Sequence, residues 1–232
     1  MLELVHVTKR YGTVVACDDL NFVLPDGSVT VLLGPNGAGK STVIKAIIGF
    51  LRHEGKILID GTENNHPSVR RSIGYVPEIP SFYPNLTVAE HMEFVARAYR
   101  LTGWNAYAEE LLKRFELYEH RKKFGDELSK GMQQKLNICI GLLTKPKLLL
   151  LDEPFIGLDP HAIKELRSVI EEMRAEGKSL LVSTHIIGSV DALWDRTIIM
   201  KKGKIAADLS RDDERAQSLE DIFFEITEGT GV

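Results

Sequence analysis

Cysteine is scarce in this sequence, and long apolar runs are absent. Only Cys17 and Cys139 occur among the 232 residues, which gives neither a zinc ligand set nor a disulfide framework. We expect both thiols to be buried. The longest wholly apolar runs, such as residues 148–151, are far shorter than the roughly 18 to 20 residues that a membrane-spanning helix needs. The sequence therefore predicts a chain that does not itself cross a membrane.

An excess of positive charge is also lacking. The sequence has 29 Lys and Arg against 33 Asp and Glu, which gives a formal net charge of −4 and does not favour a nucleic-acid partner. The N-terminus lacks a basic start followed by an apolar stretch, so we expect no secretory signal and a cytoplasmic location. With 44% hydrophobic and 27% charged residues, the composition is that of an ordinary globular domain rather than a disordered chain.

The hydrophobic pattern changes twice along the chain. Strands are predicted at residues 2–7, 20–24, 29–33, 56–60 and 72–76, whereas the pattern from about 85 to 145 is helical only. Strands at 148–152, 179–183, 197–200 and 204–208 then accompany helices at 160–176 and 187–193, and a final helix opens at Ser218. Alternation of strands and helices predicts an α/β fold with a parallel sheet, and residues 85–145 are a candidate subdomain.

A glycine-rich loop lies between the apolar strand at 29–33 and a helical pattern that follows it. Residues 34–41, Gly-Pro-Asn-Gly-Ala-Gly-Lys-Ser, match the phosphate-binding pattern G-x-x-x-x-G-K-[ST] at every fixed position. In such a loop the backbone N–H groups and the helix N-terminus bind phosphates. We expect Lys40 to contact the β- and γ-phosphates of a nucleotide and the Ser41 hydroxyl to hold Mg²⁺.

Two further strands end in residues that can take part in phosphate chemistry. The apolar run 148–151 is followed by Asp152 and Glu153, and the run 180–182 precedes His185. Asp152 could position Mg²⁺, and Glu153 could accept a proton from an attacking water. The carboxyl ends of parallel strands share one edge, so His185 is expected beside them. The alternatives are a simple Asp-Glu-Pro turn and a solvated loop histidine.

As a set, these residues resemble the nucleotide-binding subunits of ABC transporters over nearly the whole chain. The other matching positions are Tyr11, a Q-loop-like segment at 75–78, a signature segment at 128–132 and Gly-Leu-Asp at 157–159. The resemblance implies a P-loop NTPase core with an N-terminal antiparallel β subdomain and an inserted helical subdomain. It implies one domain over 1–232, with 1–79 and 146–232 as the core and β subdomain and 80–145 as the helical subdomain.

The resemblance also implies ATP and Mg²⁺ as cofactors and assigns site residues. The catalytic residues would be Glu153, His185 and Lys40, and the metal ligands Ser41, Asp152 and Glu78. The nucleotide-binding residues would be Tyr11, Asn36, Gly37, Ala38, Gly39, Lys40, Ser41, Thr42, Glu78, Ser129, Gly131 and Asp159. Tyr11 would stack on adenine, although it could instead cover the edge of a sheet, and Asp159 could serve only as the N-cap of the helix at 160–176.

The partners implied are an integral membrane permease and a second ATPase chain, identical or paralogous, in a head-to-tail dimer. In that dimer Ser129 and Gly131 would contact the ATP that the other chain holds. The chain would then hydrolyse ATP at the inner face of the cell membrane, where the permease holds it. The motifs look most like the branch that serves multidrug, antibiotic and ABC-2-type exporters.

Several residues depart from the commonest family pattern. Glu78 stands where glutamine is usual, Lys130 and Met132 replace a glycine and a glutamine, and Ile156 replaces a serine. Glu78 can still give Mg²⁺ an oxygen but lacks an amide donor for the attacking water. Between Pro80 and Pro84, Phe82 and Tyr83 are expected to be exposed and to contact a short cytoplasmic helix of the permease.

Two other functions remain open from the sequence. The first is a soluble ATPase of the ABC type that acts on ribosomes or DNA, because such proteins share the nucleotide motifs. The single compact copy and the absence of a basic patch argue against it. The second is a P-loop kinase, which would need an acceptor pocket or lid where this chain has the segment 128–134.

Overall fold

A computed structural model describes residues 1–190, 193–213 and 219–228 of the protein. Its larger sheet has six strands in the order β10-β9-β3-β8-β7-β6. These strands are β3 (Val29–Leu33), β6 (Ile73–Val76), β7 (Leu148–Asp152), β8 (Ser179–Thr184), β9 (Arg196–Lys201) and β10 (Lys204–Ser210). All neighbours pair in parallel except β10, which returns antiparallel to β9. The predicted α/β fold class is confirmed.

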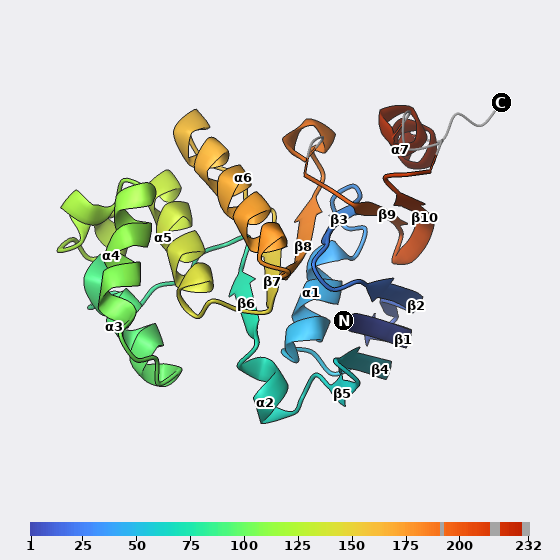
Figure 1. Ribbon diagram of the computed structural model, residues 1–232. Coiled ribbons are helices and arrows are strands. Elements are labelled where there is room, and N and C mark those ends of the chain that lie inside the picture. Colours follow the sequence, from blue (N-terminus) through green and yellow to red (C-terminus); the bar gives the residue numbers. More distant parts are fainter. Residues whose placement is uncertain (191–192, 214–218, 229–232) are drawn as a thin grey trace.

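The smaller sheet is antiparallel and consists mainly of N-terminal strands. Its order is β2-β1-β4-β5, with β1 (Leu2–Tyr11), β2 (Val14–Leu24), β4 (Glu54–Ile59) and β5 (Thr62–Glu63). In Figure 1 these strands lie on the opposite side of the molecule from the helices α3, α4 and α5. The glycine-rich loop that follows β3 therefore lies next to this second sheet.

The helices lie around the larger sheet. They are α1 (Lys40–Ile48), α2 (Pro67–Arg70), α3 (Val88–Ala98), α4 (Trp104–Arg114), α5 (Lys130–Leu143), α6 (Pro160–Ala175) and α7 (Leu219–Glu228). Figure 1 shows α1 between the two sheets, α3 to α5 gathered at one side, and α7 near β9 and β10. Single 3₁₀ turns cover Tyr118–His120, Gly125–Glu127 and Ile187–Ser189.

Two hydrophobic cores meet at the larger sheet because alternate side chains of a strand point to opposite faces. On β7, Leu148 and Leu150 belong to the core around α1 and the smaller sheet. Leu149 and Leu151 belong to the core formed with α3 to α6. Strands covered on both faces need uninterrupted apolar runs, and β3 and β7 are buried at every position.

Several local predictions are confirmed. The strand at 148–152 has the predicted bounds, and Thr87 forms the expected capping box with Glu90 at the start of α3. Cys17 and Cys139 are both buried free thiols. Asp159 caps α6, accepting a hydrogen bond from the N–H of Ala162. No helix among the described residues has the length and apolar character needed to span a bilayer.

Other local predictions are wrong or lie outside the described residues. A helix was predicted at 187–193, but its described part is one 3₁₀ turn, Ile187–Ser189. Ser189 explains the difference, because its hydroxyl donates to the Ile186 carbonyl and competes with helical bonding. Phe82 is packed against the core rather than exposed, whereas Tyr83 is 56% exposed as expected. Ser218, the predicted start of the last helix, lies outside the described residues.

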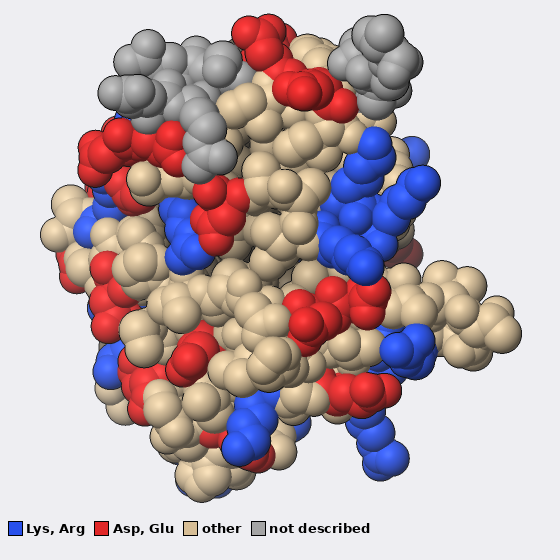
Figure 2. Space-filling view, turned by 90° about the vertical axis from the view of Figure 1, so that its right-hand side faces the viewer, with Lys and Arg blue, Asp and Glu red and all other residues tan. Residues whose placement is uncertain are grey.

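The surface charge is mixed on the face that carries the smaller sheet. Figure 2 shows basic and acidic side chains interspersed over this face, and the largest basic group adjoins an acidic one. A protein that binds nucleic acid through its phosphates usually has a continuous basic stripe. No such stripe is visible on this face, in agreement with the net charge of −4.

Candidate nucleotide site

Two glycines of the loop between β3 and α1 have no room for a side chain. A Cβ atom built on Gly34 would lie 2.5 Å from the carbonyl oxygen of Met200. Gly39 has φ +107°, and a Cβ atom on it would lie 2.4 Å from the carbonyl oxygen of Ala16. No side chain caps the N-terminus of α1. Its first N–H groups are therefore available to bind an anion such as a phosphate.

A cavity of about 650 Å³ opens over this helix N-terminus. Its volume falls within the range typical of small-molecule sites, about 300 to 1,000 Å³. It is lined by Val14, Val15, Ala16, Asn36, Gly37, Ala38, Gly39, Lys40, Ser41, Thr42, Glu78, Glu153 and Lys202. The cavity thus brings together the glycine-rich loop, the end of β7, the segment after β6 and the smaller sheet.

Lys40 is held in place although it is buried. Its Nζ donates hydrogen bonds to the carbonyl oxygens of Gly34, at 2.6 Å, and Pro35, at 3.3 Å. The same Nζ lies 3.3 Å from Oε1 of Glu153, and both side chains are nearly inaccessible to solvent. Burial of two charges is costly unless each is paired and hydrogen-bonded. The two carbonyl oxygens and the Glu153 carboxylate supply these partners and hold the ammonium group at the glycine-rich loop.

Ser41 and Asp152 form a group of oxygens that suits a magnesium ion. The Ser41 hydroxyl donates to Oδ1 of Asp152 over 3.0 Å. The hydroxyl of Ser183 donates to the same Oδ1 over 2.5 Å. Mg²⁺ prefers carboxylate and hydroxyl oxygens, usually together with water and phosphate oxygens. The chemistry of these side chains therefore fits Mg²⁺, and Glu78 on the cavity wall adds a further carboxylate.

Glu153 and His185 form a second pair at the same edge of the sheet. Nδ1 of His185 lies 2.9 Å from Oε1 of Glu153, and the backbone N–H of His185 is 3.4 Å from Oε2. Glu153 has φ +48°, a conformation that costs energy for a residue with a side chain and is concentrated at functional sites. It is held by hydrogen bonds from its N–H to the carbonyl and hydroxyl oxygens of Ser183.

The acidic groups around the cavity also act on a neighbouring tyrosine. The pKa of Tyr75, on β6, is raised, first by burial and then by the negative charges of Asp152 and Glu78. The phenol therefore stays neutral. The same negative charge would favour a cation at this end of the cavity.

Six sequence-predicted residues are not among those that line the cavity of their own chain. Two of them, Asp152 and His185, contact the lining residues Ser41 and Glu153. The other four are Tyr11, Ser129, Gly131 and Asp159. Tyr11 is 47% exposed, under the ammonium group of Lys9, and is the register partner of Val14, which lines the cavity. Ser129 is the exposed N-cap of α5. These four residues lie on the surface next to the cavity or on other elements.

Besides the smaller-sheet residues Val14, Val15 and Ala16, two polar residues at this site were not predicted from the sequence. Ser183 contacts both Asp152 and Glu153, and Lys202 lines the cavity. Ser183 could have been found, since it is the polar residue at the end of the predicted strand 179–183, shortly before His185. Lys202 gives no local signal, because it reaches the cavity only through the pairing of β9 with β3.

A buried strand, a glycine-rich loop ending in Lys40 and Ser41, and acidic residues at the end of a parallel strand define a P-loop nucleotide-binding protein. The family model described as ABC transporter matches residues 17–156. The lantibiotic transport ATP-binding protein SrtF of Streptococcus pyogenes is 36% identical over 224 residues, covering 96% of each chain. The bacitracin transport ATP-binding protein BcrA of Bacillus licheniformis is 33% identical over 98% of this chain and 76% of its own.

Solved structures agree with these similarities. An ATP-binding subunit of an ABC transporter is 35% identical, with a TM-score of 0.91 over 97% of this chain and 99% of its own. The ATP-binding cassette MJ0796, as a dimer in a post-hydrolysis state with ADP and Pi, is 28% identical, with a TM-score of 0.84 over 92% of this chain and all of its own. The chain belongs to the ABC transporter family, as an ATP-binding subunit with ATPase activity.

Proposed function

We propose that the chain binds Mg²⁺-ATP in the cavity over α1 and hydrolyses it to drive a membrane permease. The observation that carries this proposal is the meeting of Lys40, Asp152 and Glu153 at one uncapped helix N-terminus. Lys40 would contact the β- and γ-phosphates, and the N–H groups of residues 36–42 would surround them. Ser41, Asp152 and Glu78 would hold Mg²⁺, which neutralises charge on the phosphate oxygens when it is bound.

Glu153 is the general base in this proposal. As its carboxylate takes a proton from water, the water oxygen bonds to the γ-phosphorus, and the bond from that phosphorus to the bridging oxygen breaks, which leaves ADP and inorganic phosphate. His185 would orient the Glu153 carboxylate through the 2.9 Å contact of its Nδ1. Tyr11 would cover the adenine, since it lies next to the wall formed by Val14.

The proposal includes a head-to-tail dimer of this chain with itself or a paralogue. Ser129, Gly131 and Asp159 are outside the cavity of their own chain, which supports a role at the ATP of a second chain. The N-terminus of α5 presents Ser129 and Lys130 to solvent, and a helix N-terminus favours a negatively charged phosphate. We propose that the whole chain works as one ATPase domain, with residues 80–145 as the arm that carries this helix.

An apolar groove between the core and α3 to α5 is the proposed contact with the permease. It has a volume of about 310 Å³ and is lined by Ile48, Phe50, Arg70, Ile73, Gly74, Tyr75, Val95, Tyr99, Ile140, Gly141 and Thr144. Phe50 is 67% exposed, and Tyr83 and Ile79, from the segment after Glu78, are 56% and 78% exposed. Exposed aromatic side chains of this kind are common interface anchors.

The permease would select the transported substrate, but the names of the relatives suggest a class of substrate. Two of them have names that refer to lantibiotic and bacitracin transport. We propose that this chain powers an exporter of the antibiotic-transport type, from the inner face of the cell membrane. Binding to the permease would hold the chain there.

The proposal is tested by photocrosslinking from position 83 in membranes, together with ATPase assays of the purified chain. Crosslinking from Tyr83 should capture an integral membrane protein, and crosslinking from Glu119, which is exposed on the 3₁₀ turn after α4, serves as the control. Capture of ribosomal proteins or DNA instead would replace the transport role with the soluble ABC-type alternative. Absence of Mg²⁺-dependent ATP hydrolysis would remove the proposed chemistry itself.

A further inference from the structure

The signature helix α5 carries three polar side chains that are buried. Gln134, Lys135 and Asn137 are 3%, 6% and 6% exposed. A helix position that faces a core normally carries an apolar residue, because a buried polar group is costly unless it is hydrogen-bonded. The partners of these three side chains therefore indicate what each one does.

Two of the three side chains bind the loops that carry Glu78, a predicted metal ligand, and Glu153, the predicted general base. Nε2 of Gln134 donates to the carbonyl oxygen of Pro154, at 3.2 Å, and Pro154 follows Glu153. Nδ2 of Asn137 donates to the carbonyl oxygen of Pro77, at 2.8 Å, and Pro77 precedes Glu78. Asn137 also donates to Oε1 of Gln134 over 3.3 Å. One hydrogen-bonded pair on α5 thus links the Glu78 loop to the Glu153 loop.

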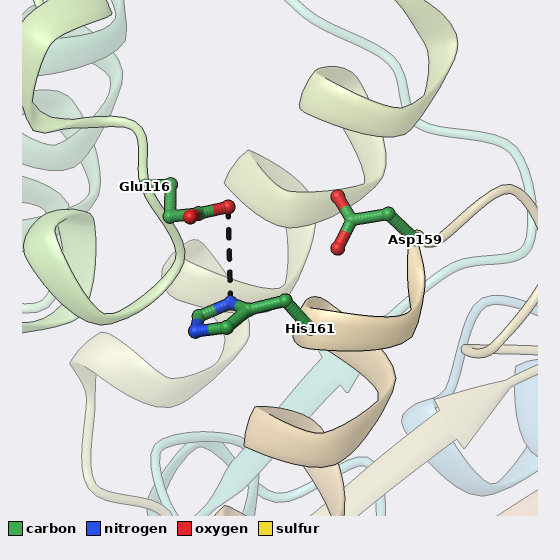
Figure 3. A group of neighbouring side chains, drawn as sticks. All are labelled: Glu116, Asp159 and His161. Atoms are coloured by element: carbon green, nitrogen blue, oxygen red, sulfur yellow. Dashed lines mark ion pairs between the residues drawn. The ribbon is translucent and has the colours of Figure 1, made fainter.

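Lys135 joins the same helix to the loop that ends at Asp159. Its Nζ lies 2.7 Å from Oδ2 of Asp159 and 3.0 Å from Oε2 of Glu116. Figure 3 shows Glu116, Asp159 and His161 facing one another, with His161 Nδ1 3.7 Å from Glu116. Both carboxylates already share the ammonium group of Lys135, so this group of side chains is satisfied without a metal ion. Burial lowers the pKa of Lys135, but its hydrogen bonds to Asp159 and Glu116 outweigh that effect and raise it.

The first turn of α5 is packed against the same loop. A Cβ atom on Gly131 would lie 2.8 Å from the carbonyl oxygen of Gly157. Oδ1 of Asp159 accepts from the N–H of Ala162, so both oxygens of Asp159 are used within the chain. The N-terminus of α5 therefore cannot shift relative to residues 154–159 without breaking several contacts.

We propose that Gln134, Asn137 and Lys135 are positioning residues that couple the two ATP sites of a dimer. The loops around Glu78 and Glu153 respond to the nucleotide in their own chain. Through the three side chains, these loops fix the position of α5, which presents Ser129 to the nucleotide of the other chain. The proposal rests on the head-to-tail dimer of the preceding subsection. It adds a path within one chain from its own ATP site to the site of its partner.

Neighbouring glutamines on α5 provide a matched test. Gln134→Leu removes the contact with Pro154, whereas Gln133→Leu, the control, removes a bond of Nε2 to the Gly125 carbonyl within the helical segment, at 3.1 Å. Asn137→Ala and Lys135→Met extend the series, and Lys135→Arg should restore the contact with Asp159.

The variants are made in a Glu153→Gln chain for binding measurements and in the wild-type chain for kinetics. Binding of a fluorescent ATP analogue to the monomer is measured first, then ATP-dependent dimerisation by light scattering, and then the Hill coefficient of hydrolysis.

Coupling predicts that Gln134→Leu and Asn137→Ala bind nucleotide as the parent does but dimerise with ATP about 5-fold to 150-fold more weakly. Their Hill coefficient should fall toward 1, while Gln133→Leu keeps parental values.

A purely structural role would lower the melting temperature of the Gln133 and Gln134 variants alike and leave the Hill coefficient unchanged. That result would overturn the inference. If Gln134→Leu does not fold, Asn137→Ala and Lys135→Met decide by the same criteria. A parent that binds no ATP removes the proposed function. A parent that binds ATP but forms no dimer removes the coupling and the pairing of the chain with itself, and leaves the ATP site standing.

Discussion

Lys40 and Glu153 form a buried ion pair in the wall of the nucleotide cavity, with Nζ of the lysine 3.3 Å from Oε1 of the glutamate. The phosphate of an incoming nucleotide would attract the same ammonium group. Lys40 would then exchange its contact with Glu153 for one with phosphate, and the carboxylate would become free to accept a proton. Binding of the substrate would in this way prepare the general base.

We expect Glu153→Gln to separate binding from hydrolysis. The amide keeps the size of the carboxylate but cannot accept a proton, so the hydrolysis rate should fall by about 10² to 10⁴. ATP affinity should be equal to that of the wild type or modestly higher, because Lys40 no longer has a carboxylate partner. Light scattering with and without Mg²⁺-ATP should show an ATP-dependent dimer. Near-normal turnover would exclude Glu153 as the base and shift attention to His185.

Lys40→Ala should remove most ATP binding, since Lys40 is the cationic side chain expected at the β- and γ-phosphates. The substitution also leaves the buried carboxylate of Glu153 without its cation. Isothermal titration with ATP measures the loss, and thermal unfolding shows whether the variant is folded. Lys164→Ala, at an exposed position on α6 outside the cavity lining, is the control and should retain binding. Equal losses in both variants would contradict a specific role for Lys40.

Tyr11→Ala should weaken ATP and GTP binding alike, by about 1 to 3 kcal/mol, if the ring stacks on the base. Stacking needs only a π-face, so it does not distinguish the two purines. Val14, which pairs with Tyr11 and lines the cavity, places the ring close enough for this role. Titrations with both nucleotides decide the matter. Loss of ATP binding alone would indicate that the base is recognised by hydrogen bonds, and no change would leave Tyr11 only the role of covering the sheet edge.

The parts of the fold that follow from local sequence were predictable. Residues 148–152 form a strand with the predicted bounds, because a short apolar run bounded by turn residues is typical of a strand buried on both faces. The Thr87 and Glu90 capping box was visible as a pattern of two residues. The glycine-rich loop was recognised from its spacing, and the close approach of Met200 and Ala16 gives the reason for two of its glycines.

The contacts that were not predicted from the sequence join residues that are far apart in the chain. The bonds of Ser183 to Asp152 and Glu153 exist because β8 lies beside β7. Asn137 bonds to Pro77, 60 positions away, and no motif in the sequence had singled it out. Phe82, predicted to be exposed because it lies between two prolines, packs against the core. Such contacts require the tertiary structure.

The ion pair of Asp159 with Lys135 predicts how the stability of the protein changes in acid. The pKa of Asp159 is lowered, first by the hydrogen bond from Lys135 and then by the N–H of Ala162. A carboxyl group with a lowered pKa in the folded state stabilises the fold above its ordinary pKa of 3.8, and this stabilisation is lost as the pH falls through the folded-state pKa. Urea unfolding should therefore show Asp159→Asn less stable than the wild type at pH 6, with a difference that disappears in stronger acid. The exposed Asp126, which forms no ion pair among the described residues, provides the control variant Asp126→Asn.

His91 gives a last prediction, about the segment that bears Tyr83. The imidazole is 4% exposed, its Nδ1 is 2.8 Å from the Thr87 carbonyl oxygen, and its Nε2 is 3.0 Å from the backbone nitrogen of Tyr83. These partners require Nδ1 to donate and Nε2 to accept. The ring also meets the edge of Phe82 at 5.1 Å and is stacked with Tyr83 at 6.3 Å between centroids. The histidine thus fixes both the backbone and the ring of Tyr83.

We expect His91→Phe to preserve the ring contacts but leave the N–H of Tyr83 without its acceptor, at a cost of about 1 to 3 kcal/mol in unfolding free energy. The effect should be local, so hydrogen exchange at the Tyr83 amide should accelerate more than exchange in β7. His91→Gln, whose amide oxygen can accept a hydrogen bond, should recover part of the protection. His53→Phe, at a position between α1 and β4, is the control and should change neither quantity. Unchanged exchange at Tyr83 in His91→Phe would mean that the aromatic packing alone holds the segment. In that case Phe82 and Phe94 would hold the surface that is proposed to contact the permease. The Phe94 ring lies 5.1 Å from the Tyr83 ring, measured between centroids. Substitutions of these two phenylalanines, rather than of His91, would then loosen the segment.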